Sequence, residues 1–193
     1  MPGLFGRLIG GGSKREAERP QFTLELPEGW AGGHGHVAYM KALLAYGRAH
    51  PECRDQAMDL LGYPGDALYA AAAPCGPGAN MTVSTVEVPA SLPLDAALDG
   101  SVESQIENLA SRSDLIGDPT SATIDTPYTG RVLRWSWSYE GARPSSFALY
   151  TFGFAGRLWD LTFGCDAVAA EVNEATFLAI ASSFRVMLPA PDR

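Results

Sequence analysis

The sequence predicts an α+β fold, with a central antiparallel sheet of about six strands and helices on both faces. Three observations lead to this prediction. In the last third of the chain, the segments 131–139 and 146–154 place large apolar residues at every second position, as strands do. Ala155-Gly156 is a tight turn into a further strand at 157–163, and strands joined by short turns run antiparallel. The apolar spacing of 172–184 predicts an amphipathic helix that packs on the sheet.

The N-terminal third supplies a tail, a strand and two short helices. Residues 1–20 combine an apolar cluster, a glycine run and a charged stretch, which is typical of a flexible tail. The alternating segment 22–26 predicts the first strand, and the glycine-rich segment 32–36 is expected to be a loop. Apolar stripes predict helices at 37–47 and 51–62, the second opened by a proline and closed by a glycine.

The middle of the chain continues the sheet. Strands are expected at 67–73 and 80–88, followed by a helix whose stripe is Val102, Ile106 and Leu109. Asp118-Pro119 is expected to end this helix before a short strand at 121–125. These elements form a single domain at 21–188, with a helical insertion at about 31–65 and the tail 1–20 in front of it.

The aromatic residues of the long strands allow two interpretations. Trp135, Trp137 and Tyr139 share one side of their strand, and Tyr150, Phe152 and Phe154 share one side of the next. We expect most of them to form core beneath a helix. The opposite sides carry further apolar residues, namely Phe147, Leu149, Trp159 and Leu161. Any part of this surface that the helices leave uncovered is the alternative, a groove for a partner segment.

Composition limits the classes of function. The 193 residues carry a net charge of −8, which argues against nucleic-acid or anionic-lipid partners, since both require dense basic patches. Three cysteines at unrelated spacings suit a reduced compartment better than a disulfide framework. No apolar run reaches the ~18 residues that span a membrane. The start of the chain lacks the pattern of a secretory signal, so we expect a cytoplasmic, bacterial protein without stable membrane insertion.

Several of these segments together resemble the PsbP/Mog-like superfamily. The resemblance rests on Phe22-Thr-Leu-Glu-Leu-Pro-Glu-Gly-Trp30, the strand at Asn80-Met81, the hairpin from Phe152 to Phe163, and an ending Phe177-x-x-Ile180-x-x-Ser183-Phe184-Arg185. It implies a central antiparallel sheet flanked by helices on both sides. It also implies a non-catalytic binding or assembly factor, similar to the LpqN-like and secretion-chaperone-like bacterial members, with no catalytic residues to carry over.

Candidate chemistry is sparse. His34, His36, His50 and Cys53 offer nitrogen and sulfur ligands within twenty residues, but their spacing matches no standard zinc pattern. No nucleophile elbow Gly-x-Ser-x-Gly occurs, and Cys165 follows a glycine at a strand end, where a small core residue is expected. The glycine runs lack the Lys and Ser/Thr of a phosphate loop. The sequence therefore predicts no enzyme and no cofactor.

The sequence thus predicts an adaptor or chaperone-type accessory protein that binds another protein. The tail and the insertion depart from the common core, and connecting segments often carry function. The candidate contact residues are Leu4, Phe5, Leu8 and Ile9 in the tail, Trp30 just before the insertion, and Tyr39 within it. A small-ligand or metal-binding protein that uses the His-rich loop is the alternative, and an enzyme ranks third.

Overall fold

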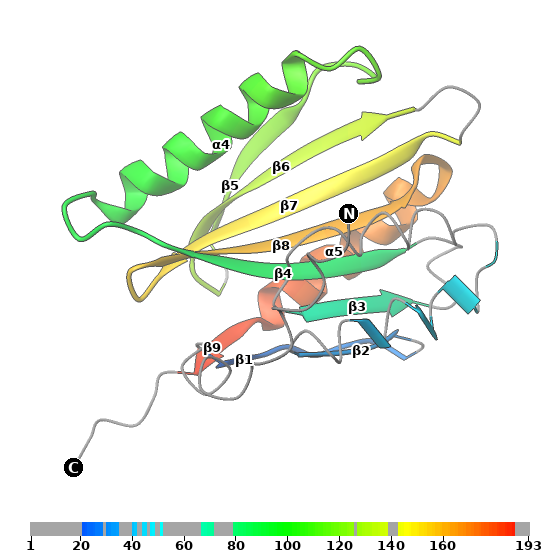
Figure 1. The fold of residues 1–193 in the computed structure, drawn as a ribbon, viewed down its shortest axis with the longest axis horizontal. Helices are drawn as coiled ribbons and strands as arrows, with labels where there is room; N and C mark the ends of the chain where they lie inside the picture. The colour runs from blue at the N-terminus through cyan, green and yellow to red at the C-terminus, as the bar shows by residue number, and fades with distance from the viewer. Residues whose placement is uncertain are drawn as a thin grey trace, which may run out of the picture.

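A computed structural model describes residues 21–28, 30–34, 67–71, 79–125, 127–138 and 143–187, with isolated positions between 40 and 51. In these residues the α+β prediction is confirmed. Seven strands form one antiparallel sheet in the order β2-β3-β4-β8-β7-β6-β5 (Figure 1). Their bounds are Trp30–His34 (β2), Ala67–Ala71 (β3), Asn80–Glu87 (β4), Thr120–Asp125 (β5), Thr129–Trp137 (β6), Ser145–Phe154 (β7) and Arg157–Asp166 (β8).

A smaller sheet joins the two ends of the described chain. β1 (Gln21–Thr23) pairs with β9 (Arg185–Met187), and Phe22 stands opposite Val186. Phe22 is buried and meets the ring of Phe184 at 5.4 Å and that of Trp159 at 6.0 Å. The small sheet therefore packs onto the main core.

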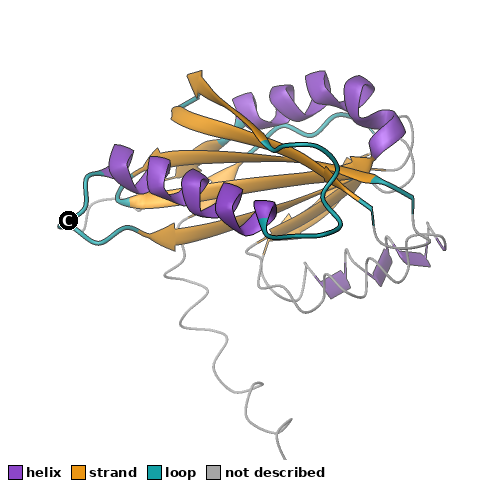
Figure 2. Ribbon diagram, turned by 90° about the horizontal axis from the view of Figure 1, so that it is seen from above, coloured by secondary structure: helices purple, strands orange, loops and turns teal. Residues whose placement is uncertain are grey.

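Two helices cover opposite faces of the main sheet, as Figure 2 shows. α4 (Leu94–Ala110) contacts β6, β7 and β8, and its Leu109 packs with Leu133 and Leu149. α5 (Ala170–Ser183) follows a short 3-10 turn, η3 (Ala167–Ala169), and packs Phe177 and Ile180 on the other face. No helix in the described part of the chain is long and apolar enough to cross a membrane.

The strand register determines which face of the main sheet each aromatic residue lies on. Tyr150 pairs with Val132 and with Leu161, so all three point toward α5. Leu133, Trp135 and Trp137 alternate with Val132 and point toward α4 instead. The two aromatic strips of the long strands thus lie on opposite faces. Trp159 and Leu161 lie on the same side of the sheet as Tyr150 rather than behind it.

Some boundaries differ from those expected. Residues 30–34 form strand β2, although 32–36 was expected to be a loop. α4 ends at Ala110, well before Asp118-Pro119, because the chain turns at Ser111. Val172 was expected on the apolar face of α5 but is 72% exposed. Strand β9 was not predicted.

Candidate functional site

A pocket opens between the first half of α5 and the ends of β5, β6 and β7. Its volume is about 280 Å³. Strand register explains why space exists there. The last row of paired residues on the α5 face is Ser136, Ser146 and Cys165. Ala148 lies one row inward beside Phe163, and the rows further inward carry the large rings of Tyr150 and Phe152. Small side chains at the end of a face lined elsewhere by large rings leave a hollow beneath the helix.

The floor of the pocket is polar. The hydroxyls of Ser136 and Ser146 hydrogen-bond to each other at 2.6 Å. Tyr150 is fully buried, and within the described residues its hydroxyl has no hydrogen-bond partner. A buried polar group of this kind is uncommon, since most find a partner in the protein or an ordered water.

Charged side chains form the wall and the mouth. Arg134 of β6 pairs with Glu174 of α5 at 2.7 Å, and exposed Glu171 and Asp118 also line the pocket. Burial raises the pKa of the Tyr150 phenol above its usual value, opposed by the charge of Arg134 and reinforced by Glu174. Arg134 thus acts on this pKa, although its guanidinium does not meet the hydroxyl in hydrogen-bond geometry. Tyr150 therefore keeps its proton and remains a donor at neutral pH.

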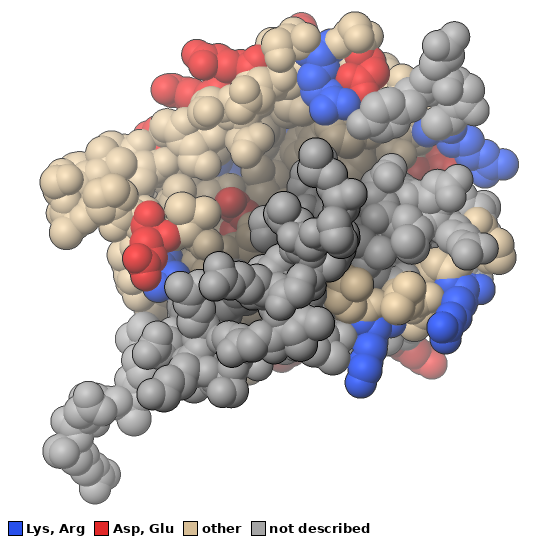
Figure 3. All heavy atoms as spheres, in the orientation of Figure 1, with Lys and Arg blue, Asp and Glu red and all other residues tan. Residues whose placement is uncertain are grey.

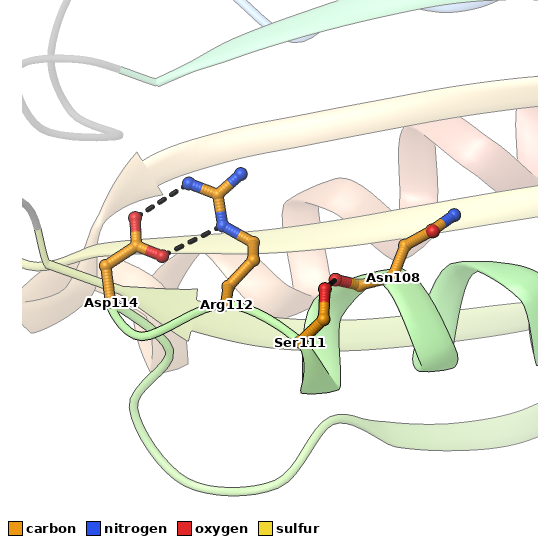
Figure 4. A network of polar contacts seen from close by, with 4 residues as sticks. All are labelled: Asn108, Ser111, Arg112 and Asp114. Carbon is orange, nitrogen blue, oxygen red and sulfur yellow. Dashed lines mark hydrogen bonds and ion pairs between the residues drawn. The ribbon is translucent and has the colours of Figure 1, made fainter.

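The segment after α4 forms the outer edge of the pocket. Arg112 holds Asp114 through two hydrogen bonds of 2.9 and 2.7 Å, and Ser111 donates to the carbonyl of Asn108 at 2.7 Å (Figure 4). These hydrogen bonds from Arg112 hold the pKa of the Asp114 carboxyl below its usual value. Beyond this turn, the backbone N–H of Ile116 donates to the carbonyl of Ser136 at 2.8 Å. The segment is thereby fixed beside β6, with Ile116 and Asp118 at the pocket.

An aromatic cluster lies on the opposite face, beyond the C-terminal end of α4. It consists of Trp135, Trp137 and Phe147, all half-buried. Trp135 stacks on Phe147 at a centroid distance of 5.3 Å, and Trp137 meets Phe147 at 4.5 Å. The guanidinium of Arg112 lies 4.3 Å from the Trp137 ring centre, a cation–π contact. Arg112 thus connects the aromatic cluster on one face with the turn that leads to the pocket on the other.

Charge on the α4 side is mainly acidic. Asp95, Asp99, Glu103 and Glu107 follow one another at intervals of four residues and are exposed. Figure 3 looks onto this side and shows acidic side chains gathered along the helix. Asp99 pairs with Arg131 of β6 at 2.7 Å. This face therefore offers an acidic helix beside the aromatic cluster.

Most residues proposed from the sequence lie outside the described ones. These are Leu4, Phe5, Leu8, Ile9, Tyr39, His36, His50 and Cys53. The backbone of His34 ends strand β2, while Trp30 at the other end of that strand is 8% exposed and meets Phe177 edge to face. This burial leaves Trp30 little surface for a partner. Within the described ranges, no three His, Cys, Asp or Glu side chains are placed to hold a metal ion.

The pocket and its residues were missed by sequence reasoning. Tyr150 alternates with other apolar residues and was assigned to the core, where its ring does lie. Nothing in the local pattern indicates that its hydroxyl lacks a partner. The only available signal was the change from large to small residues toward the ends of the strands, at Ser136, Ser146 and Cys165.

No protein-family model matches the chain, and no curated protein matches it either. Solved structures do match. Cyanobacterial PsbP (CyanoP) from Synechocystis is 14% identical over 97% of this chain and 99% of its own, with a TM-score of 0.50. A protein of Bacteroides thetaiotaomicron is 12% identical over 86% of this chain and 45% of its own, also with a TM-score of 0.50. LpqN of Mycobacterium tuberculosis, which is involved in cell envelope biogenesis, is 12% identical over 93% of this chain and 88% of its own, with a TM-score of 0.49. The chain has a PsbP-like fold, as its sequence motifs implied, and at this level of identity the similarity shows the fold alone.

Proposed function

We propose that this protein is a non-catalytic accessory protein that binds another protein through the α4 side of its sheet. The observation that supports the proposal is the aromatic cluster of Trp135, Trp137 and Phe147 with Arg112 over it. Tryptophan, phenylalanine and arginine are enriched at protein interfaces, and tryptophan and arginine supply many of the residues that dominate binding energy. Half-buried rings keep apolar surface available while they are held in place by their neighbours.

The charge beside the cluster indicates the character of the partner. The acidic series on α4 and a net charge of −8 favour a partner surface with basic side chains around an apolar centre. Long-range attraction of this kind mainly raises the association rate, while the rings supply affinity. The cytoplasmic location and the contribution of residues 1–20 expected from the sequence remain part of this proposal.

Affinity capture with matched variants tests the proposal. The tagged full-length chain is compared with Trp137→Ala and with Val168→Ser, which alters an apolar residue that is not part of the cluster and is 90% exposed on η3. We expect a specific protein to be captured by the wild type and by Val168→Ser, and its yield to fall at least tenfold with Trp137→Ala. Circular dichroism of each variant shows whether the fold is retained. Equal capture by both variants, or no reproducible partner for the wild type, would contradict the proposal.

A further inference from the structure

One residue of the pocket beneath α5, Tyr150, has a buried hydroxyl for which the described part of the chain supplies no hydrogen-bond partner. The Tyr150 side chain is wholly buried, and Tyr150 is one of the residues that line the pocket. The neighbouring hydroxyls of Ser136 and Ser146 hydrogen-bond to each other at 2.6 Å rather than to Tyr150. An unsatisfied buried hydroxyl carries a desolvation cost that an acceptor oxygen would remove. The inner end of the pocket is therefore suited to an acceptor.

The outer end of the pocket favours a positively charged group instead of an acceptor. Among the described residues, the carboxylates of Asp118, Glu171 and Glu174 line the pocket together with the guanidinium of Arg134. Arg134 is already paired with Glu174 at 2.7 Å, and among the described residues that line the pocket no other positive charge faces Asp118 and Glu171. Such a site attracts a cation and repels a carboxylate or a phosphate, and the net charge of −8 acts in the same direction.

The walls between these ends are mostly apolar. Ile116 on the segment after α4, Ala148 on β7 and Phe177 on α5 line the same cavity of about 280 Å³. This volume is near the lower end of the ~300–1,000 Å³ of pockets that hold small organic molecules. The body of a ligand must therefore be short, and a flat or aliphatic group suits the walls.

We propose that this pocket binds a small organic cation that carries an acceptor oxygen at its other end. The acceptor takes the hydrogen of the Tyr150 hydroxyl, and the ammonium group lies at the mouth near Glu171 and Asp118. This site lies on the α5 face, whereas the proposed protein-binding surface lies on the α4 face, so either proposal stands without the other.

Titration of the isotope-labelled full-length chain with p-aminomethylbenzamide, followed by NMR, tests the proposal. This probe has an ammonium group at one end of a flat body and an amide oxygen at the other. Benzamide lacks the cation, and p-carboxybenzamide replaces it with an anion. We expect saturable shifts at residues that line the pocket, with affinity for the cationic probe at least tenfold above that for the anionic one.

Two variants separate the inner and outer contacts. Tyr150→Phe keeps the ring and removes the hydroxyl, and it is expected to lower the affinity for the cationic probe about fivefold. The thermal unfolding midpoint of this variant should equal that of the wild type or exceed it. The double variant Asp118→Asn, Glu171→Gln is expected to reduce the preference for the cationic probe over benzamide. Glu28→Gln removes an exposed carboxylate that does not line the pocket and serves as the matched control, with binding unchanged.

Three results would overturn the proposal. The first is absence of saturable shifts for p-aminomethylbenzamide in the folded wild type. The second is equal or tighter binding of p-carboxybenzamide, which would make Arg134 the recognition group and the ligand an anion. The third is binding of the cationic probe that Tyr150→Phe leaves at full strength.

Discussion

At the scale of single residues, Asp160 combines burial with one strong hydrogen bond. The strand register places Arg131, Thr151, Asp160 and Ser84 in one row across the α4 face of the sheet. The Thr151 hydroxyl donates to the Asp160 carboxylate at 2.7 Å. Desolvation nevertheless raises the pKa of Asp160 above its ordinary value, and the Thr151 hydrogen bond only partly opposes this. The charged form of Asp160 is therefore costly in the folded protein.

This cost predicts a pH dependence of stability. Between the ordinary value of 3.8 and the raised folded value, the folded chain binds more protons at Asp160 than the unfolded chain does. The free energy of unfolding therefore falls as pH rises through this window. Asp160→Asn removes the charge and keeps an acceptor for Thr151, so we expect it to be more stable than the wild type at pH 7 and equal to it in acid below the window. Urea unfolding across pH measures this.

The control for this prediction is Asp118→Asn, which neutralises an exposed carboxylate. It should leave the stability difference between neutral and acidic pH nearly as in the wild type. If Asp160→Asn is instead less stable than the wild type at neutral pH, the carboxylate is stabilised by charge interactions that outweigh its desolvation.

At the scale of elements, the β7–β8 hairpin organises the sheet. Its two strands are joined by Ala155 and Gly156, which have φ angles of 53° and 71°. Positive φ at both central residues is the requirement of a type I′ turn, for which Asn-Gly is favoured. Alanine is strained there, because its Cβ disfavours the left-handed region. The turn between the two longest strands therefore contains an alanine, Ala155, at a position where asparagine would be less strained.

Substitutions in this turn should act through backbone conformation alone. A side chain added at Gly156 meets nothing within 4 Å, so steric contact does not complicate the result. We expect Ala155→Asn to raise the free energy of unfolding by ~0.5–1 kcal/mol and Gly156→Ala to lower it by about 1 kcal/mol. Thermal unfolding of the two variants beside the wild type measures both. A loss of stability in Ala155→Asn would show that the turn adopts another geometry in solution.

Elements with a clear period could be predicted from the sequence, and those set by tertiary pairing could not. The long strands and their hairpin follow from alternation of large side chains, and the helix α5 from its inward residues Phe177 and Ile180. β2 was missed because Gly32 and Gly33 carry no pattern, and pairing with β3 makes it a strand. Val172 was misplaced because it lies five residues before Phe177, which is 140° around a helix. The small residues that leave space for the pocket are visible in the sequence, but the lack of a hydrogen-bond partner for the Tyr150 hydroxyl among the described residues depends on the three-dimensional packing.

At the scale of the whole molecule, the two ends of the described chain stabilise the core together. β1 and β9 pair, and Phe22, Phe184 and Trp159 pack their rings at 5.4–6.0 Å. Two hydrogen bonds connect the segments around β1 and β9 to side chains of neighbouring parts of the chain. The backbone N–H of Glu25 donates to Ser183 at 2.8 Å, and that of Val186 donates to the Tyr128 hydroxyl at 3.0 Å. Residues more than 150 positions apart thus share one part of the core.

The pairing of β1 with β9 predicts that β1 contributes to the stability of the whole domain rather than only to local order. A chain that starts at Leu24 lacks β1 and the Phe22 ring, whereas a chain that starts at Gln21 keeps both. Both lack residues 1–20, so their difference reports on β1 alone. Loss of a buried phenylalanine costs ~3–5 kcal/mol, a large part of the 5–15 kcal/mol of a typical domain. Urea unfolding followed by tryptophan fluorescence and by far-UV circular dichroism should show one transition, shifted by at least about 3 kcal/mol in the shorter chain and coincident for both probes. If the fluorescence transition alone moves, the corner formed by β1 and β9 unfolds separately from the seven-stranded sheet.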